Sequence, residues 1–462
     1  MEPGFGLHLI IMTATTDISP LMATLSRHMA AAPTTALPPE VVEKAKHHIL
    51  DTLGAMISGA RLAPGRLAID YVRAECAAPQ AVVPGSDVET SAVNAALAGG
   101  ICAHADETDD SHPRGFCHPG CAVVPAALAM GLREGRGGND LIRAVVLGYD
   151  VGPRTTMALD PLRFYGKLHR STHAVAALFG AAAAAGAMIR LNESQCRWLL
   201  SYAAQQASGI ATWARDEEHI EKAFDFGGMN ARNGTEAAAL VGAGFTGVED
   251  VFSGPRNFFE AFGGTPDILT HELGSRFEIM DTHIKKWSIG SPAQAPLAAL
   301  EAILNAHNLG ADDIARIEAH VPDVEADIVD SRAMPDICLQ YLFAVMVLDG
   351  RVGFASSHDY DRMNAPDVRA VVERIDLIPA PDLPRRQGRT VVFTHDGRRF
   401  EDHVSDVRGT TANPMSRDEV VAKALDLMAP VLGTKRADAV ADSVMKLETL
   451  AELAELTPLL RA

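Results

Sequence analysis

Three segments of the chain consist almost entirely of small residues, mostly alanine and glycine: residues 92–103, 174–187 and 237–243. Side chains with so little bulk exclude water only if their helices approach one another closely. The sequence therefore predicts a tightly packed helical core. The weakly apolar run from Ala174 to Ile189 is shorter than the roughly 20 residues that a membrane span needs. We expect a buried helix there and no membrane association.

Helical signals extend through the first half of the chain and return in its tail. Pro38-Pro39-Glu40 opens a segment whose apolar residues recur at helical spacing. Asn192 and Gln195 form a capping box, which predicts that a helix begins there. The tail, residues 418–460, has the same helical periodicity. The first half and the tail together therefore indicate one helical unit.

A different pattern begins near residue 281. Residues 314–321 alternate between apolar and polar side chains, which predicts a half-buried strand. Two further strand candidates, residues 390–394 and 399–404, flank Asp396-Gly397, a dipeptide typical of hairpin turns. Strands that follow helices, rather than alternate with them, indicate an α+β unit.

These patterns predict a mainly α fold. A large all-α helical domain comprises residues 17–278 and is completed by residues 408–462. A smaller α+β (lid) domain, residues 279–407, is inserted before the C-terminal helices.

Charge and cysteine content exclude several functions. The chain has 41 Lys and Arg residues against 59 Asp and Glu residues, a formal net charge of −18. Nucleic-acid binding and docking on an anionic membrane both need a basic surface, so we expect neither partner. Six cysteines are too few for a disulfide framework and fit a cytoplasmic setting. We also expect no signal peptide, and Met12 is an alternative start to Met1.

Glycine motifs for nucleotides and the nucleophile elbow of serine hydrolases do not occur, so we expect no organic cofactor. The glycine pairs Gly99-Gly100 and Gly227-Gly228 are interpreted instead as helix packing points.

The densest polar cluster is residues 104–121, between two apolar segments. One interpretation is a solvated, capped loop. A second is a zinc site, although its four ligand-type residues match no standard spacing: His112, Cys117, His118 and Cys121. A third is acid/base catalysis, with Glu107 or Asp110 beside His112 and His118.

Two further clusters have plain structural interpretations. Residues 163–173 are basic, and taken alone they predict a cap before a buried helix. Residues 213–222 predict an exposed helix in which Glu218 pairs with Lys222, four residues further along.

Taken in order, these segments resemble the MmgE/PrpD family over nearly the whole chain. The family includes 2-methylcitrate dehydratase, cis-aconitate decarboxylase and iminodisuccinate epimerase. The segments that carry the resemblance are His104-Ala105, residues 109–112, His118-Pro119-Gly120, residues 148–151 with Arg154, residues 169–185, Lys222 with Gly227 and Gly234, residues 244–247, residues 348–350 and residues 413–416. The resemblance implies a large helical and a smaller α+β domain, a homodimer, and no metal or organic cofactor.

The resemblance also implies site residues. The catalytic residues fall on Glu107, His118, Lys222 and either His169 or His173. The family's threonine falls on Ser111, and a later lysine falls on Lys285 or, with a one-residue shift, on Lys286. The remaining candidates for substrate binding are His112, Arg154, Arg170, Ser291 and Gln294.

Two positions depart from the family. Gly290 stands where the decarboxylase and the dehydratase have a histidine, and the lid tyrosine of the decarboxylase is missing near residues 324–330. Ser291 and Gln294 are the candidates to donate hydrogen bonds in place of that histidine.

We predict a cofactor-independent lyase, of the dehydratase or decarboxylase type. It would abstract a C–H proton next to a carboxylate of a small polycarboxylic acid. Lysines and arginines would bind the carboxylates in this otherwise acidic protein. One alternative is an epimerase of the iminodisuccinate type, favoured by Gly290. The others are a non-catalytic polycarboxylate-binding protein and a zinc hydrolase.

Overall fold

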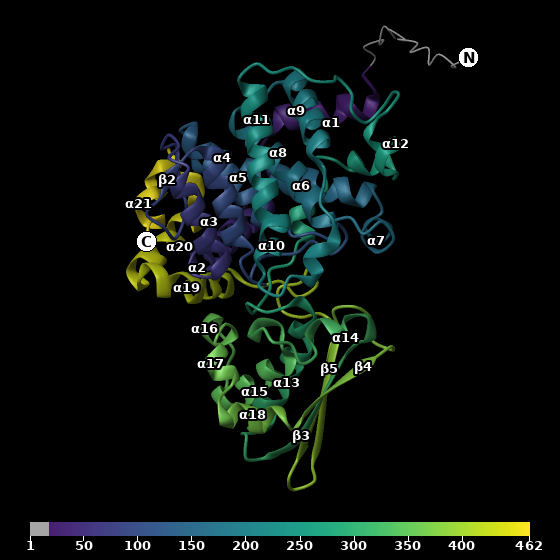
Figure 1. Ribbon diagram of the computed structural model, residues 1–462, viewed down its shortest axis with the longest axis vertical. Coiled ribbons are helices and arrows are strands. Elements are labelled where there is room, and N and C mark those ends of the chain that lie inside the picture. The colour runs from purple at the N-terminus through teal and green to yellow at the C-terminus, as the bar shows by residue number, and fades with distance from the viewer. Residues whose placement is uncertain (1–17) are drawn as a thin grey trace, which may run out of the picture.

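A computed structural model describes residues 18–462. The alternative start sites and the predicted first residue of the large domain, residue 17, lie outside the described residues. The structure is 60% helical and 9% strand, which confirms the mainly α prediction. Figure 1 shows two lobes, a large helical one and a smaller one that contains the main sheet.

The larger lobe has a hydrophobic core built from both ends of the chain. Its buried residues lie between Met22 and Ile284 and between Val420 and Leu460. The helices before the second lobe are α1 Pro20–Ala31, α2 Pro39–Gly59, α3 Ala63–Ala74, α4 Ala92–Ala103, α5 Gly120–Arg133, α6 Gly138–Ala158, α7 Pro161–Gly166, α8 Thr172–Met188, α9 Glu193–Gln206, α10 Ile220–Ala223, α11 Met229–Gly242 and α12 Phe258–Phe262. A two-stranded sheet, β1 Ala81–Val82 and β2 Glu89–Thr90, lies before α4.

The C-terminal helices return to this core, where α19 and α20 pack against α2 (Figure 1). They are α19 Arg417–Leu432, α20 Thr434–Met445 and α21 Thr457–Leu460. The predicted helical tail is confirmed, as are the predicted start of α2 and the capping box of Asn192 and Gln195 at α9.

Helix α8 is the centre of the larger core, because all of its residues are buried. It crosses α6 at positions where both helices have only glycine or alanine, so the two backbones come close together. A Cβ atom at Gly152 would lie 2.5 Å from the carbonyl oxygen of Ala176, and one at Gly148 would lie 2.8 Å from that of Gly180. The predicted close packing of small residues is therefore confirmed. Among the described residues, no helix is both long and apolar enough to span a membrane.

The two glycine pairs meet each other. A π-helical turn, η3 Phe224–Gly228, lies between α10 and α11 and packs on α4. A Cβ atom at Gly227 would lie 2.1 Å from the carbonyl oxygen of Gly100. This contact, which confirms the packing-point interpretation, places α10 beside the end of α4, where the polar cluster begins.

The second core lies between Trp287 and Val392. Its sheet has the strand order β4-β3-β5-β6, with β3 and β4 parallel and the other pairs antiparallel. Helix α13 packs on β5 and β6. The elements are α13 Ser291–His307, β3 Ile314–Pro322, α14 Asp323–Val329, α15 Leu339–Asp349, α16 Phe354–Ser357, α17 Tyr360–Met363, α18 Pro366–Val372, β4 Ile375–Ala380, β5 Gly388–Thr394 and β6 Arg399–Val404.

The three predicted strands correspond to β3, β5 and β6, and Gly397 has a φ of 86° in the predicted hairpin turn. Strand β4 was not predicted, because its residues do not alternate cleanly between buried and exposed. The two hydrophobic cores follow the predicted order along the chain, and the exact domain boundaries stay a prediction.

The contact between Gly227 and Gly100 generates a testable prediction. Alanine at position 227 should lower the free energy of unfolding by roughly 1–3 kcal/mol, because the added methyl group has no space. Gly166→Ala is the matched control, since a Cβ atom there meets nothing within 4 Å. Urea titration followed by circular dichroism measures both variants. Equal stability of Gly227→Ala and the wild type would contradict the close contact.

Candidate active site

The polar cluster connects α4 to α5 inside the protein. Residues 104–110 are all buried. The interpretation of this cluster as a solvated loop is therefore wrong. Each charged side chain among residues 104–110 must instead find a partner within the protein, because an unpaired buried charge is costly.

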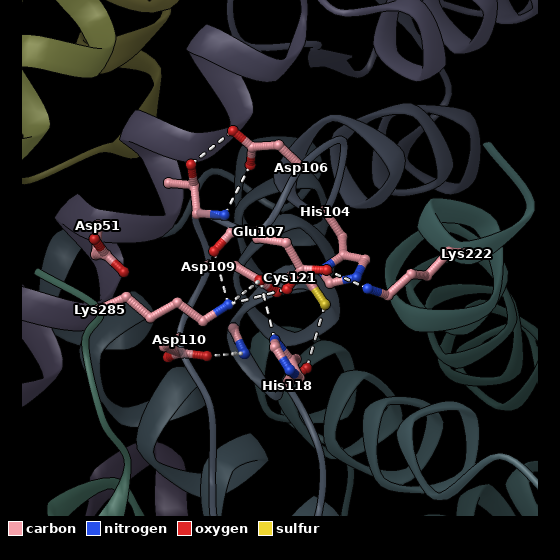
Figure 2. A network of polar contacts seen from close by, with 12 residues as sticks. Asp51, His104, Asp106, Glu107, Asp109, Asp110, His118, Cys121, Lys222 and Lys285 are labelled. Carbon is pink, nitrogen blue, oxygen red and sulfur yellow. Dashed lines mark hydrogen bonds and ion pairs between the residues drawn. The ribbon is translucent and has the colours of Figure 1, made fainter. Parts of the chain in front are cut away.

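Glu107 lies between two lysines that come from distant parts of the chain (Figure 2). The Nζ atom of Lys222, on α10, contacts Oε1 of Glu107. The Nζ atom of Lys285, just before α13, lies 3.5 Å from Oε2 and donates a hydrogen bond of 2.7 Å to the Glu107 carbonyl oxygen. Burial by itself would raise the pKa of Glu107, but the two ammonium groups hold it well below its usual range. Glu107 is thus ionised and both lysines are engaged.

A second carboxylate, Asp109, is shared by two histidines. Nδ1 of His118 lies 3.0 Å from Oδ1 of Asp109, and Nδ1 of His104 lies 3.0 Å from Oδ2. The hydrogen bond to Oδ1 requires a proton on Nδ1 of His118, which leaves its Nε2 with a free lone pair. Burial lowers the pKa of His118 although Asp109 opposes that shift. His118 is therefore suited to act as a neutral base.

His173 completes this group from the first turn of α8. Its ring stacks on Phe226 at a centroid distance of 3.7 Å and lies 5.2 Å from the His118 ring. Its Nδ1 atom is buried and has no hydrogen-bond partner among the described residues. Burial, followed by the nearby His118, holds the pKa of His173 well below its usual range. A second neutral imidazole therefore adjoins His118.

The second core closes this site with groups of its own. Nε2 of His358, which follows α16, lies 2.9 Å from Oδ2 of Asp106. Nδ1 of His358 hydrogen-bonds to the carbonyl oxygen of Phe354 at 2.8 Å. Although burial would lower it, Asp106 raises the pKa of His358 to about 9. An ion pair therefore joins the two cores directly beside Glu107.

Asp110 connects the loop to helices α2 and α5. Its Oδ2 atom lies 2.6 Å from Nδ1 of His48 on α2, and its Oδ1 atom accepts a hydrogen bond of 3.0 Å from the backbone of Gly120. The acid/base hypothesis placed Asp110 beside His112 and His118, and the structure pairs it with His48 instead. His112 contacts Glu278 at 3.1 Å.

The sequence left two choices open, His169 or His173 and Lys285 or Lys286. In each pair, one of the two residues lies in the cluster. His169 is exposed, whereas His173 lies in the cluster. Lys286 contacts Glu301 and lies over the Trp287 ring, whereas Lys285 lies in the cluster.

Several other predicted residues lie outside the cluster. The Arg154 guanidinium is buried and donates to backbone carbonyls, one of them that of Arg276 at 2.9 Å. Arg170 lies 4.7 Å from the centre of the Phe262 ring. Gln294 uses its amide to hold the backbone of Trp287 and Ile289, at 2.9 and 3.2 Å, and so shapes the segment that carries Lys285.

Ser111 and Ser291 occupy structural positions. Ser111 pairs through its backbone with His283, and Ser291 is the first residue of α13. The predicted pair of Glu218 and Lys222 is wrong, because α10 begins only at Ile220 and Lys222 points to Glu107.

The zinc hypothesis does not match the contacts of its four residues. His112 pairs with Glu278, and His118 pairs with Asp109. Burial raises the pKa of both thiols, Cys117 and Cys121, well above their usual range. A different trio, His104, Asp109 and Cys121, has potential ligand atoms within 4.8 Å of one another. The absence of a metal stays a prediction.

Sequence reasoning missed several members of the cluster. His104 and Asp109 belong to the quoted polar segment, and His219, whose ring lies 5.1 Å from that of His104, precedes the family lysine. Their proximity in sequence was an available signal. His358 lies more than 200 residues away in the second core, and no local pattern marked it.

Comparisons with known proteins agree with the resemblance read from the sequence. A family model described as the MmgE/PrpD N-terminal domain matches residues 23–270, and one described as the MmgE/PrpD C-terminal domain matches residues 287–449. A cis-aconitate decarboxylase of Homo sapiens is 26% identical over 450 residues, covering 91% of this chain and 90% of that protein. A cis-aconitate decarboxylase of Aspergillus terreus is 24% identical over 469 residues, covering 92% of each chain. A cis-aconitate decarboxylase-like protein of Aspergillus oryzae is 24% identical over 464 residues, covering 92% and 94%.

The placement of Glu107 predicts a stability effect. Glu107→Gln should cost the folded state roughly 3–5 kcal/mol at pH 7, because the buried Lys285 and the partly buried Lys222 lose their carboxylate. The pKa of Glu107 is lowered in the folded state, so its contribution is present at neutral pH and is lost as the pH falls through that lowered pKa. Urea titrations at pH 7 and at lower pH measure the difference from the wild type.

The matched control is Glu301→Gln, which removes the carboxylate from Lys286. Both side chains of that pair are about one-third exposed, at 31% and 30%. Exposed pairs contribute only about 0–1 kcal/mol. Equal losses for the two variants would contradict the buried arrangement around Glu107.

Proposed function

The chain belongs to the MmgE/PrpD family, and on that basis we propose that it is a cofactor-independent lyase acting on a small polycarboxylic acid. The reaction is of the decarboxylase or dehydratase type. One observation carries the proposal: the buried Lys285 and the partly buried Lys222 lie beside a histidine that a carboxylate orients as a base. The relatives compared above are named for decarboxylation of cis-aconitate, a tricarboxylic acid.

Substrate binding is the role of the two lysines. The protein has a net charge of −18 and needs a local reversal of sign to bind an anion. Lys222 and Lys285 provide it and are both partly neutralised by Glu107 while no substrate is bound. A substrate carboxylate would share or replace Glu107 as their partner through charge-assisted hydrogen bonds.

In a dehydration or an epimerisation, proton abstraction is the role of His118. Removing a proton from carbon next to a carboxylate builds negative charge on that carboxylate, and a lysine placed there stabilises the charge. The free Nε2 of His118 accepts the proton, and Asp109 stabilises the imidazolium that forms. His173, at a ring distance of 5.2 Å, is placed to contact the same substrate.

The second candidate function is epimerisation of a dicarboxylate, and Gly290 favours it. The family resemblance implies a histidine at this position in the decarboxylase and the dehydratase. Here the Gly290 N–H donates a hydrogen bond of 3.0 Å to the carbonyl oxygen of Asp336, so the position supplies no imidazole. In that reaction a proton returns to the opposite face of the same carbon. The fold by itself does not choose between these outcomes.

Four alanine variants test the proposal. His118→Ala, His173→Ala and Lys222→Ala should each lower kcat about 10²–10⁴-fold, the range typical of a lost acid, base or charge-stabilising group. His169→Ala is the matched control and should keep wild-type turnover, since its side chain is exposed. Proton NMR in D2O with cis-aconitate, citrate, 2-methylcitrate, malate and iminodisuccinate follows loss of the C–H signal and identifies the product.

Each outcome has a defined meaning. A decarboxylated acid indicates a carboxy-lyase, an unsaturated acid with loss of water indicates a hydro-lyase, and exchange with inversion supports the epimerase. Full turnover by both His118→Ala and Lys222→Ala would contradict the assigned roles. Stabilisation of the protein by these acids without any reaction indicates a binding protein instead.

A further inference from the structure

The larger lobe has a cavity of about 480 Å³, partly open to solvent, to which the proposed mechanism gives no role. Its lining consists of three apolar residues and five that are charged or can carry a charge: Arg114, Arg154, His271, Arg276 and Glu278. None of these residues belongs to the cluster around Glu107 and His118. Three arginines against one glutamate make the lining basic, in a chain whose net charge is −18.

Arg154, on α6, is the fixed part of this lining and is 2% exposed. Its guanidinium donates hydrogen bonds to the carbonyl oxygens of His271 and Arg276, the second at 2.9 Å. Its Nε atom is buried without a hydrogen-bond partner among the described residues and lies 3.9 Å from Oδ1 of Asp150. Its Nη2 atom lies 3.5 Å from Oε1 of Glu278. Both distances to a carboxylate exceed the usual length of a hydrogen bond, so the buried charge is only partly compensated.

The other two arginines are accessible to solvent and lie near one carboxylate, that of Asp281. Nη2 of Arg276 contacts Oδ2 of Asp281, and Nη1 of Arg114 lies 3.9 Å from the same oxygen atom. Nε of Arg276 lies 3.6 Å from Oε1 of Glu278. A guanidinium has five N–H donors, and these contacts use only some of them. Both arginines can therefore bind a further anion.

Glu278 connects the cavity to the loop that carries His118. Its Oε2 atom lies 3.1 Å from Nε2 of His112, and Nδ1 of His112 accepts a hydrogen bond of 2.8 Å from the Gly115 N–H. An anion that engages the cavity's arginines would therefore change the partners of a carboxylate that holds this loop.

We propose that this cavity is a second anion site, which binds a small molecule with two or more carboxylate or phosphate groups. Guanidinium groups bind both kinds of group through paired hydrogen bonds. Arginines from three separate segments favour an anion with more than one such group. The volume of the cavity is within the range of small-molecule sites. No lining residue takes part in the proposed reaction, so this inference does not rest on the proposed function.

Isothermal titration calorimetry with pyrophosphate and with citrate tests the inference and distinguishes phosphate from carboxylate ligands. Sodium chloride keeps the ionic strength constant, and at least one of the two anions should bind. Arg276→Gln should weaken this binding about 10–100-fold, because a charge-assisted contact is lost. Arg316→Gln is the matched control, since its guanidinium is also accessible to solvent and pairs with Asp376 at 2.7 Å, but lies on β3 in the other lobe. It should bind as the wild type does.

Asp281→Asn separates a binding role from a structural one. It should strengthen the binding several-fold, because it releases Arg276 and removes a negative charge that lies near Arg114. Damage to the fold would weaken binding in both variants. Opposite effects of Arg276→Gln and Asp281→Asn therefore support the inference, and weaker binding by both variants overturns it.

Lys222→Ala separates the cavity from the candidate active site. The binding that Arg276→Gln weakens should remain at wild-type strength in Lys222→Ala. Loss of that binding in Lys222→Ala, or the absence of binding by either anion to the wild type, overturns the inference. Failure of the wild type to turn over any acid of the panel contradicts the proposed function instead.

Discussion

The structure depends on the burial of a charged loop between two hydrophobic cores. Glu107 can be buried because Lys222 and Lys285 neutralise it, and these lysines come from segments 115 and 178 residues further along the chain. Asp109 is buried beside two histidines: it accepts a hydrogen bond from His118, and the Nδ1 atom of His104 lies 3.0 Å from its other oxygen. Each pairing fixes one segment relative to another, because separating any of them would leave an uncompensated charge inside the protein. The candidate site and the arrangement of the elements around it are thus set by the same interactions.

Small residues determine how close those segments come. The backbone of Gly227 touches that of Gly100, and this contact places the π-helical turn and Lys222 beside the end of α4. Larger residues would separate the helices and move the ammonium group away from Glu107. The alanine and glycine segments therefore do more than exclude water, since they set the distances on which the charge pairs depend.

The boundary between the two cores is where the chemistry of this family would take place. The larger core supplies the histidines and Lys222, whereas the segment entering the second core supplies Lys285. His358 reaches the same place from the second core itself. Sites between two units are common because each unit can supply different groups, and relative movement can admit substrate.

The sequence by itself determined the helical class, the capping box at Asn192, three strands of the second core and the importance of residues 104–121. These features depend on local periodicity, capping and composition, which neighbouring residues encode. The sequence did not separate His173 from His169 or Lys285 from Lys286, and no local pattern marked His358. Only the tertiary structure shows which of these side chains lie in the cluster, because contacts between residues far apart in the sequence depend on how helices pack and how buried charges are paired.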